Sequence, residues 1–281
     1  MKQLVFFDID GTLVMKNGRI PDSTKRAIEA LKQEDILPVL ATGRAPAMIN
    51  KVSRELAIPN YISMNGQYVV ADGEVIYDNP IDKGTLQQFS SFTKEQEDGY
   101  ILCGSEEIFA GKTMNNKSST YKVLKELSKF VPSRLQMSYL KRSMKNHPNP
   151  GAYSDKNVYQ AILQTSIVNE EKYAEQFPSL RFTKSNTYLF DVINSQVSKA
   201  TGIKQVLDYF GTTVDRSIAF GDHLNDLEML QYVKTGIAMG NAMPDTKQVA
   251  DMVTSTVDKD GIYRALVELE MIPNILGKTV N

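Results

Sequence analysis

Cysteine is almost absent from this sequence. Cys103 is the only cysteine among 281 residues, so an internal disulfide cannot form, and a zinc site built from several cysteines is excluded. No basic neighbour that would lower the pKa of the thiol is evident, and we interpret Cys103 as a small apolar filler. A chain without disulfides suits a reducing compartment, so we expect a cytoplasmic protein.

An excess of charge of one sign is also missing. The 32 Lys and Arg residues balance 33 Asp and Glu residues, which leaves a formal net charge of −1. Such a chain has no basic field to hold nucleic acid or anionic lipid, so we expect neither a nucleic-acid partner nor a membrane. No obligate protein partner is evident from the sequence. Small-molecule chemistry fits this composition better.

Long hydrophobic runs do not occur near the beginning of the chain. The apolar run from Leu4 to Phe7 meets the acid Asp8 immediately, which makes it too short for a signal sequence or a membrane span. We therefore expect the protein to stay where it is made. Internal repeats and low-complexity tracts are not visible either, so an ordinary globular fold is expected.

The overall composition indicates a folded protein with more than one domain. Apolar residues make up 42% of the chain and charged residues 23%, which is close to the average of globular proteins. A single hydrophobic core stops growing at roughly 250–300 residues. With 281 residues, two domains are the natural expectation.

The first third of the chain alternates between strand and helix patterns. The apolar periodicity and the capping residues predict strands at 4–7, 37–40 and 61–63 and helices at about 22–32 and 46–56. Strands that alternate with helices are typical of a parallel sheet covered by helices on both faces. This part of the chain therefore predicts a doubly wound α/β fold.

The middle of the chain has a different character. Asp72-Gly73 predicts a hairpin at the edge of the first sheet. Beyond Pro80 the sequence has polar, helix-like stretches at about 83–98 and 115–129, with scattered strands between them. We interpret residues 82–187 as an inserted α/β domain.

The alternating pattern returns in the last third. We predict strands at 188–193, 217–220 and 237–239, helices at 199–210 and 224–231, and a further helix from Pro244. Residues 1–81 and 188–281 are therefore expected to form one discontinuous, Rossmann-like core domain around the insertion.

Four short motifs carry chemically useful side chains. They are Asp8-Ile9-Asp10-Gly11-Thr12, Ala41-Thr42-Gly43-Arg44, Lys199 with its neighbours, and Gly221-Asp222-His223-Leu224-Asn225-Asp226. Three of the four motifs follow predicted strands. Because the carboxyl ends of parallel strands line one crevice, residues that are distant in sequence are expected to meet there.

The aspartates of these motifs predict a metal site. Asp8, Asp10, Asp222 and Asp226 would bring up to four negative charges together, and like carboxylates at close range cannot all stay ionised without compensation. A divalent cation would supply that compensation. Hard oxygen ligands without paired histidines or cysteines favour Mg²⁺ over zinc.

The remaining motif residues are suited to binding phosphate. Lys199 adds a positive charge, and Thr42 and the backbone amides around Gly43 can donate hydrogen bonds to phosphate oxygens. Each motif alone also has a purely structural explanation, as a turn or a helix cap. Their combined order after strands makes that shared explanation a poor one, and we interpret the site as built for phosphoryl transfer.

Other candidate features carry less weight. Gly111-Lys112-Thr113 is similar to the end of a P-loop, but Glu106 stands where the required glycine would be. His223 and His147 are the two histidines, and neither is interpreted as the catalytic base, although either could touch substrate.

The order of the four motifs resembles that of the haloacid dehalogenase superfamily, and the chain looks like a phosphatase of its Cof-type subfamily (type IIB, with an α/β cap). The resemblance covers essentially the whole length. It implies that Asp8 attacks phosphorus to form an aspartyl phosphate and that Asp10 acts first as a general acid and then as a base. It also implies that residues 82–187 are a cap domain that selects the substrate.

The resemblance assigns roles to the other motif residues as well. Thr42 and Lys199 would hold the phosphoryl group, and Asp222 would bind magnesium. By the same resemblance, Asn225 would lie near phosphate and Lys199, and Asp226 would bind metal-held water.

Two further segments, Ser63-Met64-Asn65-Gly66 and Gly240-Asn241-Ala242, also match features of this family. They make Asn65 and Asn241 additional candidates for substrate binding. One departure is Ala200, where relatives often have glycine, and we do not expect it to remove activity.

Three functions remain open from the sequence. The first is a Mg²⁺-dependent phosphatase that acts on a small phosphorylated metabolite, such as a sugar phosphate, pyridoxal phosphate or flavin mononucleotide. The second is a phosphomutase of the same superfamily, which would return the phosphoryl group to its substrate. The third is a catalytically idle binding protein, which is disfavoured because all four aspartates are present.

Overall fold

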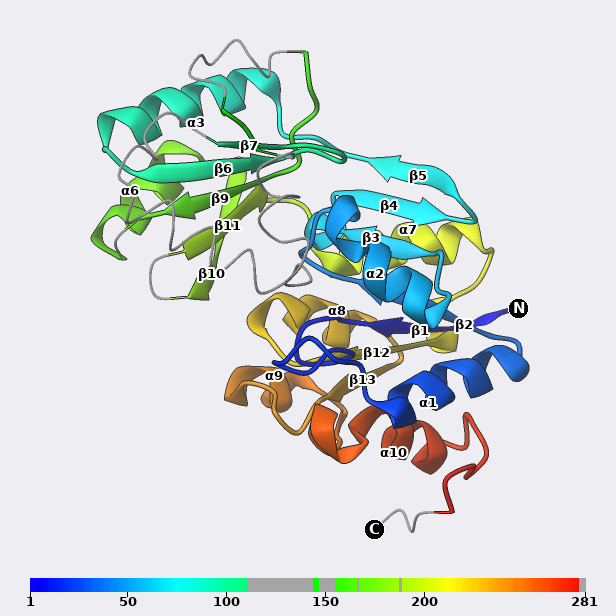
Figure 1. The fold of residues 1–281 in the computed structure, drawn as a ribbon. Coiled ribbons are helices and arrows are strands. Elements are labelled where there is room, and N and C mark those ends of the chain that lie inside the picture. Colours follow the sequence, from blue (N-terminus) through cyan, green and yellow to red (C-terminus); the bar gives the residue numbers. More distant parts are fainter. Residues whose placement is uncertain (111–143, 147–154, 166, 187–188, 278–281) are drawn as a thin grey trace. The chain divides into compact units, whose positions relative to one another are not determined.

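A computed structural model describes residues 1–110, 144–146, 155–165, 167–186 and 189–277 (Figure 1). The chain divides into two compact units. The first unit comprises Met1–Arg44, Ile49–Asp78 and Ser198–Asn281, and the second comprises Ala45–Met48 and Asn79–Val197. The predicted helix at 115–129, the Gly111-Lys112-Thr113 segment and His147 lie outside the described residues.

The first unit is built around an eight-stranded sheet with the order β14-β13-β12-β1-β2-β3-β4-β5. The strands from β14 to β3 run parallel, whereas β4 and β5 form an antiparallel hairpin at the edge. Their bounds are β1 Gln3–Phe7, β2 Ile36–Ala41, β3 Tyr61–Ser63, β4 Tyr68–Ala71, β5 Glu74–Asp78, β12 Ser217–Gly221, β13 Thr235–Ala238 and β14 Met252–Val253. The predicted doubly wound α/β sheet is confirmed.

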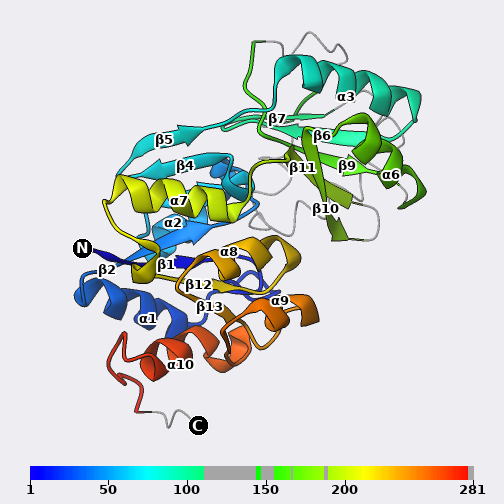
Figure 2. The ribbon, with the colours of Figure 1, turned by 180° about the vertical axis from the view of Figure 1, so that it is seen from behind.

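The helices of the first unit cover both faces of this sheet. They are α1 Asp22–Gln33, α2 Pro46–Leu56, α7 Lys199–Tyr209, α8 Leu227–Tyr232, α9 Pro244–Val249 and α10 Gly261–Glu268. Short 3₁₀ turns occur at η1 Met64–Gly66, η4 Val214–Arg216, η5 Leu224–Asp226 and η6 Val257–Lys259. In Figures 1 and 2, α1 and α10 lie side by side along one side of the sheet.

The apolar run of β1 is continuous because the strand is buried on both faces. Val5 and Phe7 pack with α1, α2 and α10, whereas Leu4 and Phe6 pack with α7 and α8. Successive side chains of a strand point to opposite faces, so a central parallel strand needs apolar residues at every position. This burial fixes the strand whose carboxyl end carries Asp8.

The second unit contains a six-stranded sheet with the order β10-β11-β9-β6-β7-β8. Its elements are α3 Lys83–Glu95, β6 Gly99–Cys103, β7 Ile108–Ala110, β8 Met144–Asn146, β9 Gln160–Gln164, α6 Ile167–Gln176, β10 Leu180–Asn186 and β11 Leu189–Asn194. An aromatic cluster holds it together, in which Phe89 of α3 lies 5.9 Å from both Tyr100 and Tyr173 between ring centroids.

The strand at 189–194 differs from the prediction. We expected residue 188 to begin the return to the first sheet, but β11 pairs antiparallel with β9 and β10 and belongs to the second sheet. The second unit continues to Val197. The reason is physical: a buried apolar run indicates that a strand exists but does not identify its neighbours.

The end of the chain contains one helix that was predicted and one that was not. The helix expected from Pro244 is confirmed as α9, which ends at Val249, whereas α10 was not predicted. Eight residues give only two turns of apolar periodicity, and α10 begins after Asp260 in a left-handed conformation (φ 62°). Its buried face, which includes Tyr263 and Leu266, becomes evident only against the sheet.

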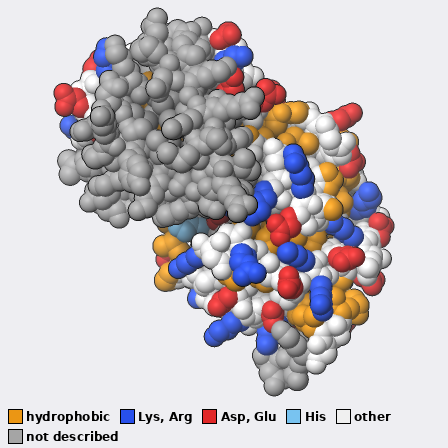
Figure 3. All heavy atoms as spheres, in the orientation of Figure 1, with side chains coloured by type: hydrophobic (Ala, Val, Ile, Leu, Met, Phe, Trp, Pro, Cys, Tyr) orange, Lys and Arg blue, Asp and Glu red, His pale blue; other side chains and the backbone are white. Residues whose placement is uncertain are grey.

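The surface and the helices of the described residues agree with two features of the sequence, its balanced charge and its lack of a long hydrophobic run near the beginning. Figure 3 shows Lys and Arg side chains interspersed with Asp and Glu over the described part of one face. None of the described helices has the length and hydrophobicity that a membrane span requires.

Candidate active site

The first motif forms a tight loop directly after β1. The backbone N–H of Asp8 donates to the carbonyl of Phe220 (3.0 Å), which continues the pairing of β1 with β12. Gly11 has a φ of +86°, and a Cβ atom at this position would collide with the carboxylate of Asp222. Only glycine fits both the conformation and the space. The loop therefore brings Asp8 close to the Gly-Asp motif after β12.

Three of the four predicted aspartates come together. Asp8, Asp222 and Asp226 each offer a carboxylate oxygen, and these oxygens lie within 4.8 Å of one another. Asp226 is fully buried and Asp8 is 5% exposed. Such a group of hard oxygen ligands is compatible with a divalent metal ion. Asp10, the fourth predicted aspartate, does not belong to this group.

Lys199 lies between two of these carboxylates. It is the first residue of α7 and is fully buried. Its Nζ atom donates to Oδ1 of Asp8 and to Oδ1 of Asp226, each at 2.6 Å. Burial alone would lower the pKa of Lys199, but the carboxylates of Asp226 and Asp8 outweigh burial and raise it. The lysine therefore stays charged inside the protein.

The charge of Lys199 does not balance the whole acidic group. Burial raises the pKa of Asp8 well above its ordinary value; Lys199 lowers it in part, and the neighbouring aspartates raise it further. One ammonium faces three carboxylates, so the group attracts a further cation.

Asp226 holds the loop after β12 in shape. Its Oδ2 atom accepts the backbone N–H groups of Asp222 and His223, each at 2.9 Å, while its other oxygen binds Lys199. A Cβ atom on Gly221 would lie 2.6 Å from the side chain of Asp226, so only glycine allows this approach. Asp226 therefore anchors both the lysine and the loop.

Of the three acids, Asp222 alone has no ion pair with a Lys or Arg among the described residues. Its Oδ1 atom accepts the hydroxyl of Thr12 (3.0 Å), and Nδ2 of Asn241 lies 3.4 Å from Oδ2. Burial, together with the nearby Asp226, raises the pKa of Asp222 to about 7. Of the three carboxylates it is the one best suited to bind an added cation.

Asp10 forms a separate ion pair with Arg44. Nε of Arg44 donates to Oδ2 of Asp10 (2.8 Å), and Nη2 donates to Oδ1 (2.6 Å). The Thr-Gly-Arg motif was visible in the sequence, but no role was predicted for Arg44. The available signal was its position after β2, where a long cationic side chain can reach the aspartates at the end of β1.

The second motif is joined to the segment after β3. Thr42 is 1% exposed, its backbone N–H donates to Ile62 (2.9 Å), and its carbonyl accepts the N–H of Asn65 (3.0 Å). A Cβ atom on Gly43 would lie 3.1 Å from the amide of Asn65. Oδ1 of Asn65 accepts Nδ2 of Asn225 (2.9 Å). Thr42, Gly43, Asn65 and Asn225 therefore form one continuous set of contacts.

Asn241 joins two loops. Its Nδ2 atom donates to the carbonyl of Gly11 (2.8 Å), and its Oδ1 atom accepts the N–H of Val257 (2.9 Å). Both ends of the amide are therefore engaged with backbone groups. These contacts stabilise the loop that carries Asp10, next to Asp222.

The other singled-out side chains are less suited to chemistry. Cys103 is buried, and burial raises its pKa to about 12, which agrees with the filler role predicted for it. His223 is partly buried, and burial is the main cause that lowers its pKa.

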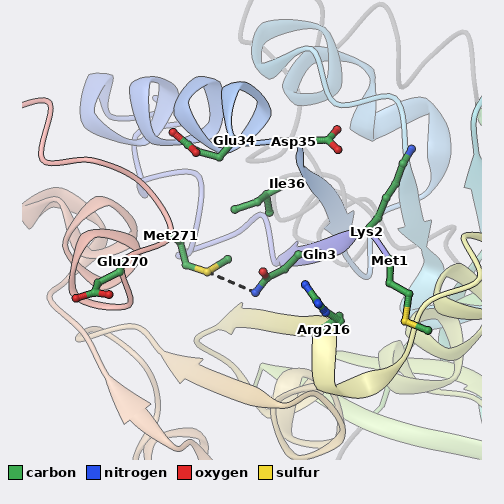
Figure 4. A pocket seen from close by; sticks show the side chains of 9 residues that line it. All are labelled: Met1, Lys2, Gln3, Glu34, Asp35, Ile36, Arg216, Glu270 and Met271. Atoms are coloured by element: carbon green, nitrogen blue, oxygen red, sulfur yellow. Dashed lines mark hydrogen bonds between the residues drawn. The ribbon is translucent and has the colours of Figure 1, made fainter.

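A cavity of about 420 Å³ lies elsewhere on the first unit (Figure 4). Gln3 and Ile36, which line it, are the first residues of β1 and β2, and Arg216 directly precedes β12. In Figure 4 the Gln3 side chain is hydrogen-bonded to Met271. The acidic group follows the opposite ends of the same strands, so the cavity is not part of the candidate site.

Comparison with known proteins gives matches over nearly the full chain. A sequence model of the family described as haloacid dehalogenase-like hydrolase matches residues 5–266. The chain is 32% identical over 270 residues to the putative phosphatase YkrA of Bacillus subtilis (strain 168), covering 96% of this chain and 98% of that protein. It is 27% identical over 281 residues to the 5-amino-6-(5-phospho-D-ribitylamino)uracil phosphatase YitU of the same strain, covering 94% and 96%.

Solved structures also match this chain over nearly its full length. The HAD subclass IIB sugar phosphatase BT4131 aligns with a TM-score of 0.82 and 28% identity, covering 96% of this chain and 100% of that one. A hypothetical protein from Geobacillus kaustophilus HTA426 aligns with a TM-score of 0.84 and 34% identity, covering 97% and 100%.

Proposed function

Because the chain belongs to the haloacid dehalogenase-like hydrolase family, we propose that it is a Mg²⁺-dependent phosphatase that acts on a small phosphorylated metabolite. The match confirms the superfamily and the enzyme class that the motifs predicted. The observation that carries the proposal is the group of Asp8, Asp222 and Asp226 at the ends of β1 and β12, in which Lys199 binds Asp8 and Asp226.

The donor set fits magnesium. Asp8 and Asp222 supply carboxylate oxygens, the group contains neither cysteine nor histidine, and Asp222 has no Lys or Arg partner among the described residues. Asp226 would contribute less directly, because Lys199 and two backbone N–H groups already bind its oxygens. When bound, Mg²⁺ would neutralise charge on the phosphoryl oxygens.

The residues of the chain would carry out two displacements. In the first, an oxygen of Asp8 forms a bond to phosphorus while the ester P–O bond breaks, and Asp10 gives its proton to the leaving oxygen. In the second, a water molecule gives a proton to Asp10 while the water oxygen forms a bond to phosphorus. The bond between Asp8 and phosphorus breaks, which releases phosphate and restores Asp8. Lys199 would stabilise the phosphoryl oxygens in both steps, and Thr42 with the amides near Gly43 would hold them.

The remaining candidate residues would support this geometry. Asn225, Asn65 and Asn241 would keep the motif loops in register through the contacts described above. Asn65 and Asn225 would also contact the substrate directly, because Asn65 adjoins Thr42 and Gly43 and its side chain is hydrogen-bonded to that of Asn225.

We also propose that the second unit is a cap that selects the substrate. Its main segment leaves the first unit after β5 and returns directly before Lys199, the first residue of α7, so the returning connection leads straight into the site. A cap of this size would admit small esters and exclude macromolecules. The names of the relatives, a sugar phosphatase and a phosphatase of a ribitylamino-uracil phosphate, support a small sugar-like or cofactor-like ester.

The test is phosphate release by the purified chain from a panel of small esters, including hexose phosphates, pyridoxal phosphate and flavin mononucleotide. We expect turnover with Mg²⁺, none with excess chelator, and none for Asp8→Asn. Asp208→Asn, which removes an exposed aspartate of α7, is the matched control. Loss of ester without phosphate release would indicate a phosphomutase, and better turnover of a folded phosphoprotein would contradict the cap.

A further inference from the structure

The ion pair between Arg44 and Asp10 uses both oxygens of the carboxylate. Nε binds Oδ2 at 2.8 Å and Nη2 binds Oδ1 at 2.6 Å. A guanidinium that donates two parallel hydrogen bonds fixes the plane of a carboxylate as well as its position. A lysine could hold the charge but not the plane.

The arginine is the anchored member of the pair. Its side chain is 9% exposed, whereas that of Asp10 is 39% exposed. The backbone of Arg44 is held on both sides, because its N–H donates to the hydroxyl of Thr42 (3.2 Å) and its carbonyl accepts the N–H of Met64 (3.1 Å). Arg44 is therefore held in place more firmly than Asp10, and it orients the carboxylate of Asp10.

The pair separates Asp10 from the other acids of the site. Lys199 binds Asp8 and Asp226, and no contact of Lys199 reaches Asp10. Asp10 follows Asp8 by two residues on the same loop, so without a cation of its own it would add a fourth negative charge near the acidic group. Each aspartate of the first motif thus has its own cation: Lys199 binds Asp8, and Arg44 binds Asp10.

We infer that Arg44 is a positioning residue that holds Asp10 in the orientation from which it protonates the leaving group. The inference rests on the proposed function. One oxygen of the carboxyl stays bonded to Arg44 while the other passes its proton to the ester oxygen; the P–O bond to that oxygen breaks as Asp8 bonds to phosphorus. Loss of Arg44 would leave the proton donor present but unoriented.

Leaving groups of different quality test this role. The leaving group of p-nitrophenyl phosphate is stable as an anion and needs little protonation, whereas that of phenyl phosphate needs more. The readout is kcat/KM for the two esters, because it reports formation of the aspartyl phosphate. A purely structural defect, or weaker binding of the phosphoryl group, would lower kcat/KM for the two esters by the same factor.

The variants are Arg44→Gln, Arg44→Lys, Asp10→Asn and the double variant, with Arg54→Gln on an exposed position of α2 as control. We expect Arg44→Gln to lower kcat/KM for phenyl phosphate about tenfold more than for p-nitrophenyl phosphate, within the usual range of acid catalysis. Arg44→Lys should give a smaller selective loss. The double variant should lose little beyond Asp10→Asn, because both changes remove one function.

An unchanged ratio of the two esters in folded Arg44 variants would overturn the inference. If Arg44→Gln does not fold, as judged by its thermal transition, the ratio measured for Arg44→Lys decides. Absence of turnover by the unmodified chain on every phosphate ester would overturn the proposed function together with this inference. Turnover by the unmodified chain with equal losses for both esters would overturn the role of Arg44 alone.

Discussion

Lys199 and Arg44 bind neighbouring aspartates of one loop in very different surroundings. Lys199 is fully buried between Asp8 and Asp226, which are themselves almost completely buried. Arg44 is nearly buried, but its partner Asp10 is 39% exposed. Water can solvate Asp10 in part when Arg44 is removed, whereas Asp8 and Asp226 have little access to water if Lys199 is removed. The comparison indicates a buried charge centre beside an ion pair that water can reach.

Asp222 is the third case. It has no Lys or Arg partner among the described residues, and its pKa is raised to about 7. Lys199 is paired with Asp8 and Asp226, and Arg44 is paired with Asp10. Asp222 is therefore the acid at which an added divalent ion can bind. Variants of these residues should therefore differ widely in their effect on stability.

Removal of the buried cation should have the largest effect on stability. Lys199→Met leaves Asp8 and Asp226 buried without a counter-charge, and we expect it to lower the free energy of unfolding by about 3–5 kcal/mol. Denaturant unfolding of the metal-free proteins measures it. Lys204→Met, on the same helix but in an exposed pair, should change stability little. Equal losses for the two variants would break the comparison.

Magnesium should stabilise the chain through Asp222. At a Mg²⁺ concentration of about 100 times Kd, binding to the folded state adds about 2.7 kcal/mol and raises the midpoint of thermal unfolding. Asp222→Asn should remove this dependence on Mg²⁺, whereas Asp208→Asn should retain it. A full Mg²⁺ response in Asp222→Asn would contradict the assigned metal ligand.

The pH dependence of stability should report the raised pKa of Asp222. A carboxyl whose pKa is higher in the folded than in the unfolded state favours folding fully below about pH 4, and this contribution is lost as pH rises through about 7. Without metal, Asp222→Asn should therefore gain about 1–3 kcal/mol over the parent above pH 7 and nothing near pH 4. A constant difference between the two proteins at all pH values would refute it.

Removal of the half-exposed pair should have the smallest effect on stability. Arg44→Gln leaves Asp10 in contact with water, so we expect a loss of about 0.5–1 kcal/mol in the free energy of unfolding. The measurement is the same denaturant titration as for Lys199→Met. A loss of several kcal/mol would show that Arg44 is a structural cation like Lys199, and would remove the distinction between the two pairs.

The sequence predicted the centre of the site better than its periphery. Asp8 and Asp222 meet because both follow parallel strands and so lie at the same edge of the sheet, which the alternation of strands and helices is enough to anticipate; the pairing of β1 with β12 was not predicted. The contact between Arg44 and Asp10 depends on which way two side chains turn at the surface of the loops. No pattern in the sequence encodes that choice.

The same limit applies to the fold. The apolar run of β1 predicted a buried strand because burial on both faces demands it. The run of β11 was equally visible, but its pairing with β9 and β10 is decided by long-range packing rather than by the strand itself. Asn241 shows the limit for a single residue, since its contacts to Gly11 and Val257 join segments far apart in sequence.

The central claim is that Asp8 forms a covalent bond to phosphorus. The direct measurement is to quench the chain with acid during turnover of a good small substrate, digest it, and determine the fragment that carries the phosphoryl group by mass spectrometry. We expect the label on the fragment that contains Asp8, with loss on hydroxylamine treatment and no label in Asp8→Asn. A phosphoryl group on another residue, such as His223, or continued turnover by Asp8→Asn would contradict the account.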